Sequence, residues 1–235
     1  MVVGVFCEKN REGVSFEDCA KCAECLPAPI IGSLRIYENK KPRNVYFVRE
    51  LVSCLRKAYF ERKEQPQDHF YKIRELISIK RGKLFGGMAS STNWQELDGS
   101  IEYEIGREKV KLTGRLDAYH PTNLEITEIK SKKIFNNTIL PKQKDVLQLQ
   151  CYGTIFKDIF HVRKLRLVYF DMDMFEQYLI PFIDRTKWLK ERIHILHIGV
   201  RESKPPKQEQ SFECQYCSYK ERCELTVKIK SHGNV

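Results

Sequence analysis

The sequence predicts an α/β protein whose central mixed sheet is flanked by helices. Segment 111–118 alternates apolar and polar residues as a half-buried strand does, and segment 124–130, after a turn, predicts a returning strand. The segment that follows, 142–160, instead repeats its apolar residues at helical spacing. With 42% hydrophobic residues, the 235-residue chain can bury one large core, with or without small appendages.

The remaining elements follow the same two periodicities. Residues 51–59 and 68–81 carry helical stripes of apolar residues, and 184–200 predicts an amphipathic helix. Residues 165–172 and 175–182 predict two further strands joined by a short turn. Residues 201–210, which contain a Pro-Pro pair, predict a linker to the C-terminal cysteines.

The two predicted strands 111–118 and 124–130 bring three charged residues to one place. In 111–118 the apolar residues share one face of the strand, and Asp117 lies on the other. A turn at 120–123 returns the chain, and the period of two puts Glu128 and Lys130 on one face of the second strand. A hairpin would therefore bring Asp117, Glu128 and Lys130 close together.

These side chains suit hydrolysis of a phosphodiester. Mg²⁺ or Mn²⁺ held by Asp117 and Glu128 would stabilise charge on the attacking and leaving oxygens. Lys130 would orient and help deprotonate the attacking water, and its ammonium would offset charge that develops on the phosphate. On the following helix, the four-residue spacing puts Gln148 and Tyr152 on one face, where they would contact the backbone of a bound DNA strand.

The order of a strand Asp, a strand Glu-x-Lys and a helical Gln-x3-Tyr resembles the RecB-like branch of the PD-(D/E)xK nucleases. A Glu-x-Lys pair by itself is more often a solvated strand face in a chain with 31% charged residues. The resemblance implies a restriction-endonuclease-like core and a Mg²⁺- or Mn²⁺-dependent deoxyribonuclease, with Asp117, Glu128 and Lys130 as its catalytic residues.

Four cysteines extend this resemblance. Cys214-x2-Cys217-x5-Cys223 lies near the C-terminus, and Cys54 stands about 160 residues earlier. Such thiolates bind tetrahedral Zn²⁺ or an iron–sulfur cluster, and spacing alone does not choose between them. Together with segment 50–60, the pattern resembles the CRISPR-associated Cas-four exonuclease family of iron–sulfur nucleases. That resemblance implies a [4Fe-4S] cluster that ties the N- and C-terminal parts together.

The N-terminal segment predicts a second metal site. The spacing Cys7-x11-Cys19-x2-Cys22-x2-Cys25 fits a small zinc knuckle, and it also fits a second cluster; zinc is the favoured metal. We therefore expect a cysteine-rich metal-binding segment over residues 1–45 and a nuclease domain over 46–235. Cys151, within the predicted helix 142–160, is expected to be a buried, inert thiol.

The charge of the chain favours a polyanionic partner. A net charge of +10 and a pI near 9.1 suit DNA, because Lys and Arg contacts to phosphate drive nucleic-acid affinity. The lysines expected to contact DNA lie near the hairpin: Lys132, Lys133, Lys142 and Lys144. No signal peptide or membrane span is visible, which predicts a cytoplasmic protein. Nine cysteines in such a chain indicate metal binding rather than a disulfide framework.

The Cas-four resemblance implies an exonuclease that trims single-stranded DNA ends of prespacers during CRISPR adaptation, with the CRISPR integrase proteins as partners. The alternative is a non-catalytic or weakly active DNA-binding subunit of an adaptation or repair complex. The family usually carries a His metal ligand a few residues after a Gly, but segment 81–87 holds none. His69 lies before the helix and is expected at the surface.

Overall fold

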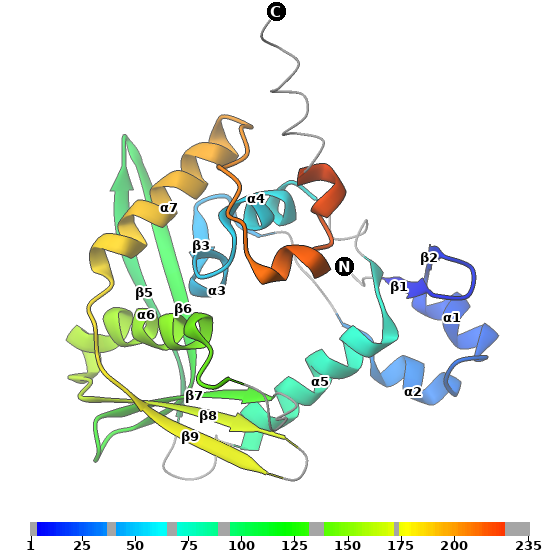
Figure 1. Cartoon of the computed structure of the whole chain (residues 1–235), viewed down its shortest axis with the longest axis horizontal. Coiled ribbons are helices and arrows are strands. Elements are labelled where there is room, and N and C mark those ends of the chain that lie inside the picture. The colour runs from blue at the N-terminus through cyan, green and yellow to red at the C-terminus, as the bar shows by residue number, and fades with distance from the viewer. Residues whose placement is uncertain are drawn as a thin grey trace, which may run out of the picture.

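The computed structural model describes residues 4–36, 41–64, 70–88, 95–131, 139–171 and 174–223. Within these ranges the chain forms two lobes, each built on its own sheet (Figure 1). His69, Lys132 and Lys133 lie outside the described residues. No helix in the described part of the chain is long and apolar enough to cross a membrane.

The larger lobe contains a six-stranded mixed sheet, which confirms the predicted fold class. Its strand order is β3-β6-β7-β8-β9, and β5 pairs with β6. The β3–β6 and β7–β8 pairs are parallel, whereas β5–β6, β6–β7 and β8–β9 are antiparallel. The strands span Val45–Phe47 (β3), Gln95–Ile105 (β5), Glu108–His120 (β6), Glu125–Ser131 (β7), Lys164–Phe170 (β8) and Phe175–Ile180 (β9).

Helices cover this sheet and close its core. They are α3 (Val48–Leu51), α4 (Leu55–Lys63), α6 (Gln143–Phe160) and α7 (Thr186–Arg201), and α4 packs against α7. Figure 1 shows α6 and α7 lying across one side of the sheet. The buried face of β6, from Val110 through Leu116, forms one hydrophobic core with apolar residues of α6 and α7. The predicted alternation of the 111–118 strand and the helix within 142–160 are thereby confirmed.

Two glycines let α6 approach the sheet closely. Gly99 of β5 and Gly114 of β6 face each other across the strand pair. A Cβ at Gly99 would lie 2.5 Å from the ring of Phe156, and one at Gly114 would lie 3.0 Å from the ring of Tyr152. The absence of side chains at these positions therefore makes room for the two aromatic rings of α6.

Gly99→Ala is expected to destabilise the protein, because the Phe156 ring is fully buried and cannot move aside. Overpacking of this kind costs about 1–3 kcal/mol, and the melting temperature should fall by roughly 3–10 °C. Gly32→Ala is the matched control, because its added Cβ meets nothing within 4 Å in a helix. A thermal melt of both variants checks this; equal melting temperatures would contradict the packing argument.

The smaller lobe joins the N-terminal segment to residues much later in the chain. Its sheet has the order β2-β1-β4 and consists of Gly4–Cys7 (β1), Glu12–Val14 (β2) and Phe70–Tyr71 (β4). The lobe also contains α1 (Phe16–Cys22), α2 (Ala28–Ser33) and the start of α5 (Ile73–Met88). Leu76 of α5 is buried in the lobe's own hydrophobic cluster. The lobe therefore uses residues on both sides of position 45, and the boundary at 45 stays a prediction.

Candidate active site

Strands β6 and β7 diverge where the predicted acidic residues lie. Their pairing covers three residue pairs, from Ala118–Thr127 to His120–Glu125, whereas β7 stays paired with β8 along its whole length. Just beyond the Ala118–Thr127 pair, the backbone N–H of Ile129 donates a hydrogen bond to Asp117 Oδ2 at 2.7 Å. The Asp117 carboxylate thus takes the place of the next ladder acceptor where the β6–β7 pairing ends.

A chain of hydrogen bonds joins the Glu-x-Lys pair of β7 to the inner face of α6. Lys130 Nζ donates to Glu128 Oε1 at 2.6 Å and to Gln148 Oε1 at 2.9 Å. Gln148 Nε2 donates to Glu128 Oε1 at 3.1 Å and to the Tyr152 hydroxyl at 2.8 Å. These contacts confirm the shared strand face of Glu128 and Lys130 and the shared helix face of Gln148 and Tyr152.

Tyr152 lies beneath this network rather than on its surface. Its side chain is buried, with the residue only 6% exposed, and its ring packs on Gly114. Burial raises the pKa of the phenol, so its hydroxyl remains protonated while it accepts the Gln148 hydrogen bond. In the structure Tyr152 holds Gln148 in place; contact of Gln148 and Tyr152 with DNA stays a prediction.

Glu128 is a buried carboxyl group that needs a positive charge beside it to ionise. Only 3% of the residue is exposed, and burial raises the pKa of its carboxyl to about 7, although Lys130 opposes the shift. Burial lowers the pKa of Lys130, but the Glu128 charge and hydrogen bond outweigh it and leave that pKa raised. Lys130 is therefore an ammonium ion in this arrangement.

The donor set fits a divalent metal ion. Glu128 Oε2 is buried and has no hydrogen-bond partner among the described residues. Asp117 adds a second carboxylate, and its charge contributes to the raised pKa of Glu128. Mg²⁺ is commonly held by one or two carboxylates, with water and substrate phosphate completing its coordination. Asp117 and Glu128 together could therefore hold one Mg²⁺ or Mn²⁺ ion.

No third metal-binding side chain is already in place beside Asp117 and Glu128 in the described part of the chain. Across the described ranges, no group of three or more His, Cys, Asp or Glu side chains is arranged to hold a metal ion. The side chains after Lys83 in segment 81–87, where a family His would stand, are not described.

Asp145 is a further acidic residue at this site that the sequence analysis did not identify. It lies one helical turn before Gln148 on α6, is buried, and accepts a hydrogen bond from the Tyr169 hydroxyl at 2.9 Å. Its charge raises the pKa values of both Glu128 and Lys130, so it lies within electrostatic reach of them. The spacing of Asp145, Gln148 and Tyr152, three and then four residues apart, is the sequence signal that could have revealed it.

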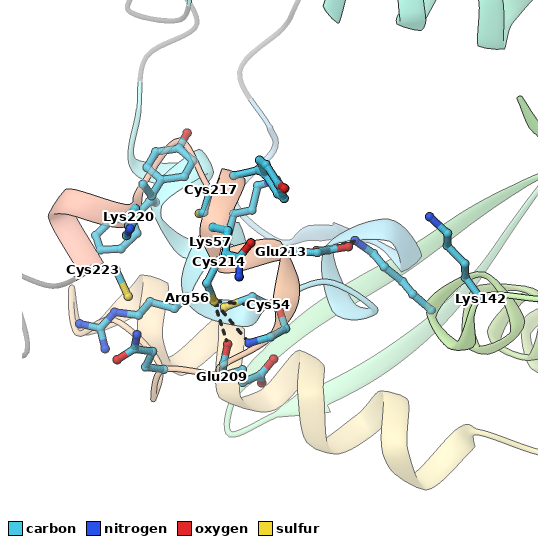
Figure 2. Close-up of a pocket in the computed structure, with 17 residues that line it drawn as sticks. Cys54, Arg56, Lys57, Lys142, Glu209, Glu213, Cys214, Cys217, Lys220 and Cys223 are labelled. Carbon is cyan, nitrogen blue, oxygen red and sulfur yellow. Dashed lines mark hydrogen bonds and ion pairs between the residues drawn. The ribbon is translucent and has the colours of Figure 1, made fainter. Parts of the chain in front are cut away.

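The two described lysines of the predicted DNA-binding set lie at the start of α6. Lys142 precedes the helix, and Lys144 forms an ion pair with Glu213 at 2.9 Å. Both line a pocket of about 510 Å³ that also reaches the C-terminal cysteines (Figure 2). Contact of Lys142 and Lys144 with DNA remains a prediction, as it does for Lys132 and Lys133.

The same pocket gathers the early cysteine and the three late ones. Cys54, Cys214, Cys217 and Cys223 all line it, as Figure 2 shows. Burial raises the pKa of Cys223, and the other three thiols raise it further, so each of them lies within electrostatic reach of Cys223. Cys214 Sγ accepts a hydrogen bond from Ser211 N at 3.4 Å. The fold therefore brings residues about 160 positions apart to one place.

Contacts outside the cysteines hold the C-terminal segment against α4. Tyr219 stacks on Phe60 with ring centroids 5.6 Å apart, and its hydroxyl donates to Glu64 at 2.5 Å. Arg192 of α7 donates to Ser53 O at 2.6 Å and to Glu209. These contacts hold the C-terminal cysteines on the same side of the lobe as Cys54. Cys151 is buried apart from them, and burial raises its pKa to about 12, which confirms the expectation of an inert thiol.

The chain resembles known proteins in sequence pattern and in fold. No curated protein matches the chain. Among solved structures, the protein SSO0001 is 22% identical, with a TM-score of 0.57 over 79% of this chain and 89% of that chain, which shows a shared fold. A phage-related exonuclease from Haemophilus somnus 129PT is 11% identical, with a TM-score of 0.29 over 55% of this chain and 67% of that chain.

The family model described as PD-(D/E)XK nuclease superfamily matches residues 34–224, which include the diverging strands, the α6 network and all four cysteines of the pocket. Because that match covers most of the chain, this protein belongs to the PD-(D/E)XK nuclease superfamily.

Proposed function

We propose that this protein is a Mg²⁺- or Mn²⁺-dependent deoxyribonuclease that shortens single-stranded DNA from its ends. The observation that carries the proposal is the meeting of Asp117, Glu128 and Lys130 where β6 and β7 diverge. The superfamily provides the nucleic-acid substrate class and the requirement for a divalent metal. The net charge of +10 supports a polyanionic substrate.

Each side chain has a distinct task in this proposal. Asp117 and Glu128 would hold the metal ion, which when bound supplies Lewis-acid stabilisation of the phosphate and activation of a water molecule. Gln148 binds Glu128 through its amide nitrogen and Lys130 through its amide oxygen, so it keeps both groups oriented. The Lys130 ammonium, already charged in this environment, offsets negative charge that develops on the phosphate.

The choice of a single-stranded end as substrate, and of CRISPR adaptation as the process, follows from the Cas-four resemblance. In that process the protein would trim prespacers together with the CRISPR integrase proteins. The pocket that gathers Cys54, Cys214, Cys217 and Cys223 supports the proposal, because it provides four thiols for one [4Fe-4S] cluster beside the nuclease core.

A cleavage assay on defined substrates tests the activity. Protein purified without oxygen is incubated with end-labelled linear single strands, matched duplexes and circular single strands, in Mg²⁺, Mn²⁺ or EDTA. We expect shortening of linear single strands in Mg²⁺ or Mn²⁺ and no cleavage in EDTA. Circular strands should survive, because an exonuclease needs an end. Cleavage of circles as fast as linear strands would exclude the exonuclease assignment.

A second function is favoured by the lack of a His in segment 81–87. With one ligand fewer than the family pattern, the protein could serve as a DNA-binding subunit of an adaptation or repair complex that cuts poorly or not at all. The same assay separates the two functions. Salt-sensitive DNA binding without cleavage in either metal would support the binding subunit and overturn the enzyme.

A further inference from the structure

The smaller lobe gathers four thiols at the junction of its hairpin and its helices. Cys7 ends β1, Cys19 and Cys22 lie one turn apart on α1, and Cys25 lies in the loop before α2. Ala23 ends α1 in a left-handed conformation, and its N–H donates to the carbonyl of Cys19, so the chain turns back here. The family model begins only at residue 34 and therefore does not include these cysteines.

An ion pair brings the hairpin to this loop. Lys9, in the β1–β2 turn two residues after Cys7, contacts Glu24 at 2.5 Å, and Glu24 lies between Cys22 and Cys25. Burial raises the pKa of the Cys19 thiol, and Cys25, Cys22 and Cys7 each raise it further. Cys7, Cys22 and Cys25 therefore each lie within electrostatic reach of Cys19, although as they stand in the structure the four thiols are not yet arranged around a metal ion.

The lobe has a small hydrophobic core. Within the described residues, partly buried side chains pack against the six buried members of its cluster: Val5, Phe16, Ile31, Leu34, Ile36 and Leu76. A core of this size supplies little net stability, and natural domains of similar size add disulfides or a structural metal. Here the cysteines are thiols rather than disulfides.

We infer that Cys7, Cys19, Cys22 and Cys25 bind one structural zinc ion that fastens the β1–β2 hairpin to α1. Four thiolates with two-residue spacings are a common structural zinc set. Cys22 and Cys25 are exposed, so their side chains can rotate into a tetrahedral arrangement without disturbing the buried cluster. Redox-inert zinc suits a site so open to solvent better than an iron–sulfur cluster does.

The site would also stabilise the joint between the two lobes. Strand β1, which ends at Cys7, pairs in parallel with β4, and Leu76 at the start of α5 is buried in the same cluster. Helix α5 runs from the smaller lobe toward β7, the strand that carries Glu128 and Lys130 (Figure 1). A zinc ion at the cysteines would thus hold the anchor of this connecting helix.

Elemental analysis of full-length protein tests the inference. Zinc and iron are measured in the parent and in three variants: Cys22→Ser, Cys25→Ser and Lys21→Ser. Lys21→Ser is the matched control, because it introduces the same side chain at an exposed neighbour on α1. We expect about one zinc ion per chain in the parent and in Lys21→Ser, and a loss of at least about fivefold in both cysteine variants. Cys217→Ser should keep this zinc ion.

Cobalt provides a second measurement on the unaltered chain. Zinc-depleted parent protein titrated with Co²⁺ should develop the thiolate-to-cobalt absorption of a tetrahedral four-sulfur site, even if a cysteine variant proves insoluble. Equal zinc in Cys22→Ser and Lys21→Ser, or iron lost from Cys22→Ser in place of zinc, would overturn the zinc assignment. None of these readings depends on DNA cleavage, so failure here is distinguishable from failure of the nuclease proposal.

Discussion

Glu128→Gln is expected to reduce the rate of metal-dependent DNA cleavage by at least about 100-fold. Removal of a side chain that only orients a metal ligand usually costs less than this. The substitution keeps the size of the side chain but removes the charge of a buried carboxylate whose Oε2 has no hydrogen-bond partner among the described residues. With only Asp117 left as an anionic ligand, the metal ion would be bound weakly. Cleavage rates over a range of Mn²⁺ concentrations measure the effect.

Glu102→Gln is the matched control for this variant, because Glu102 is an exposed residue of β5 in the same sheet. It should cut as fast as the parent. Both variants should melt close to the parent temperature, which would show that a lost rate is not a lost fold. If Glu128→Gln cuts as fast as Glu102→Gln, the assignment of the active site is wrong.

Cys217→Ser is expected to remove the brown colour of the anaerobically purified protein and to lower its melting temperature by about 10 °C or more. The cluster would join Cys54 to residues about 160 positions later, so its binding free energy is coupled to closure of a very long loop. The stacking of Tyr219 on Phe60 and the Arg192 contacts remain in the variant. These contacts should keep the C-terminal segment partly in place, but they should not restore the full melting temperature of the parent.

Gln215→Ser is the control here, because it introduces the same residue at an exposed position two residues away. Its colour, iron content and melting temperature should match those of the parent. Elemental analysis decides the identity of the metal. Stoichiometric zinc at these cysteines in anaerobic protein, with no iron, would refute the iron–sulfur proposal and leave a zinc-bound staple in its place.

Local patterns in the sequence were sufficient to locate the central elements of the larger lobe. Alternation predicted 111–118 as a strand, and the turn at 120–123 predicted 124–130 as a returning strand; the structure has Glu108–His120 and Glu125–Ser131. Helical spacing predicted 142–160 and 184–200, and the helices span Gln143–Phe160 and Thr186–Arg201. The strand 111–118 and the two helices were located because one face of each lies in the core, so burial imposes its periodicity on the sequence, whereas β7 is buried on both faces at its start.

Elements that depend on distant partners were not predicted. β5 is an 11-residue strand, but its segment is rich in acidic residues, and its strand form depends on pairing with β6 along nearly its whole length. The short strand β4 pairs with β1, which lies more than 60 residues earlier in the sequence. The predicted helix 68–81 begins only at Ile73 and continues to Met88, because residues 70–71 are drawn into that sheet.

The residue types of the candidate site and their order along the chain are properties of the sequence itself. Asp117, Glu128 and Lys130 lie on adjacent strands, and the spacing of Gln148 and Tyr152 puts them on one helix face. Only the tertiary structure decided how these groups meet. β6 and β7 part after Thr127 while β7 stays paired with β8. Helix α6 approaches closely enough for Gln148 to bind Glu128 because Gly99 and Gly114 leave room for the aromatic rings of the helix. Pairing between distant strands and packing across a sheet depend on the whole chain, so no local pattern in the sequence could determine them.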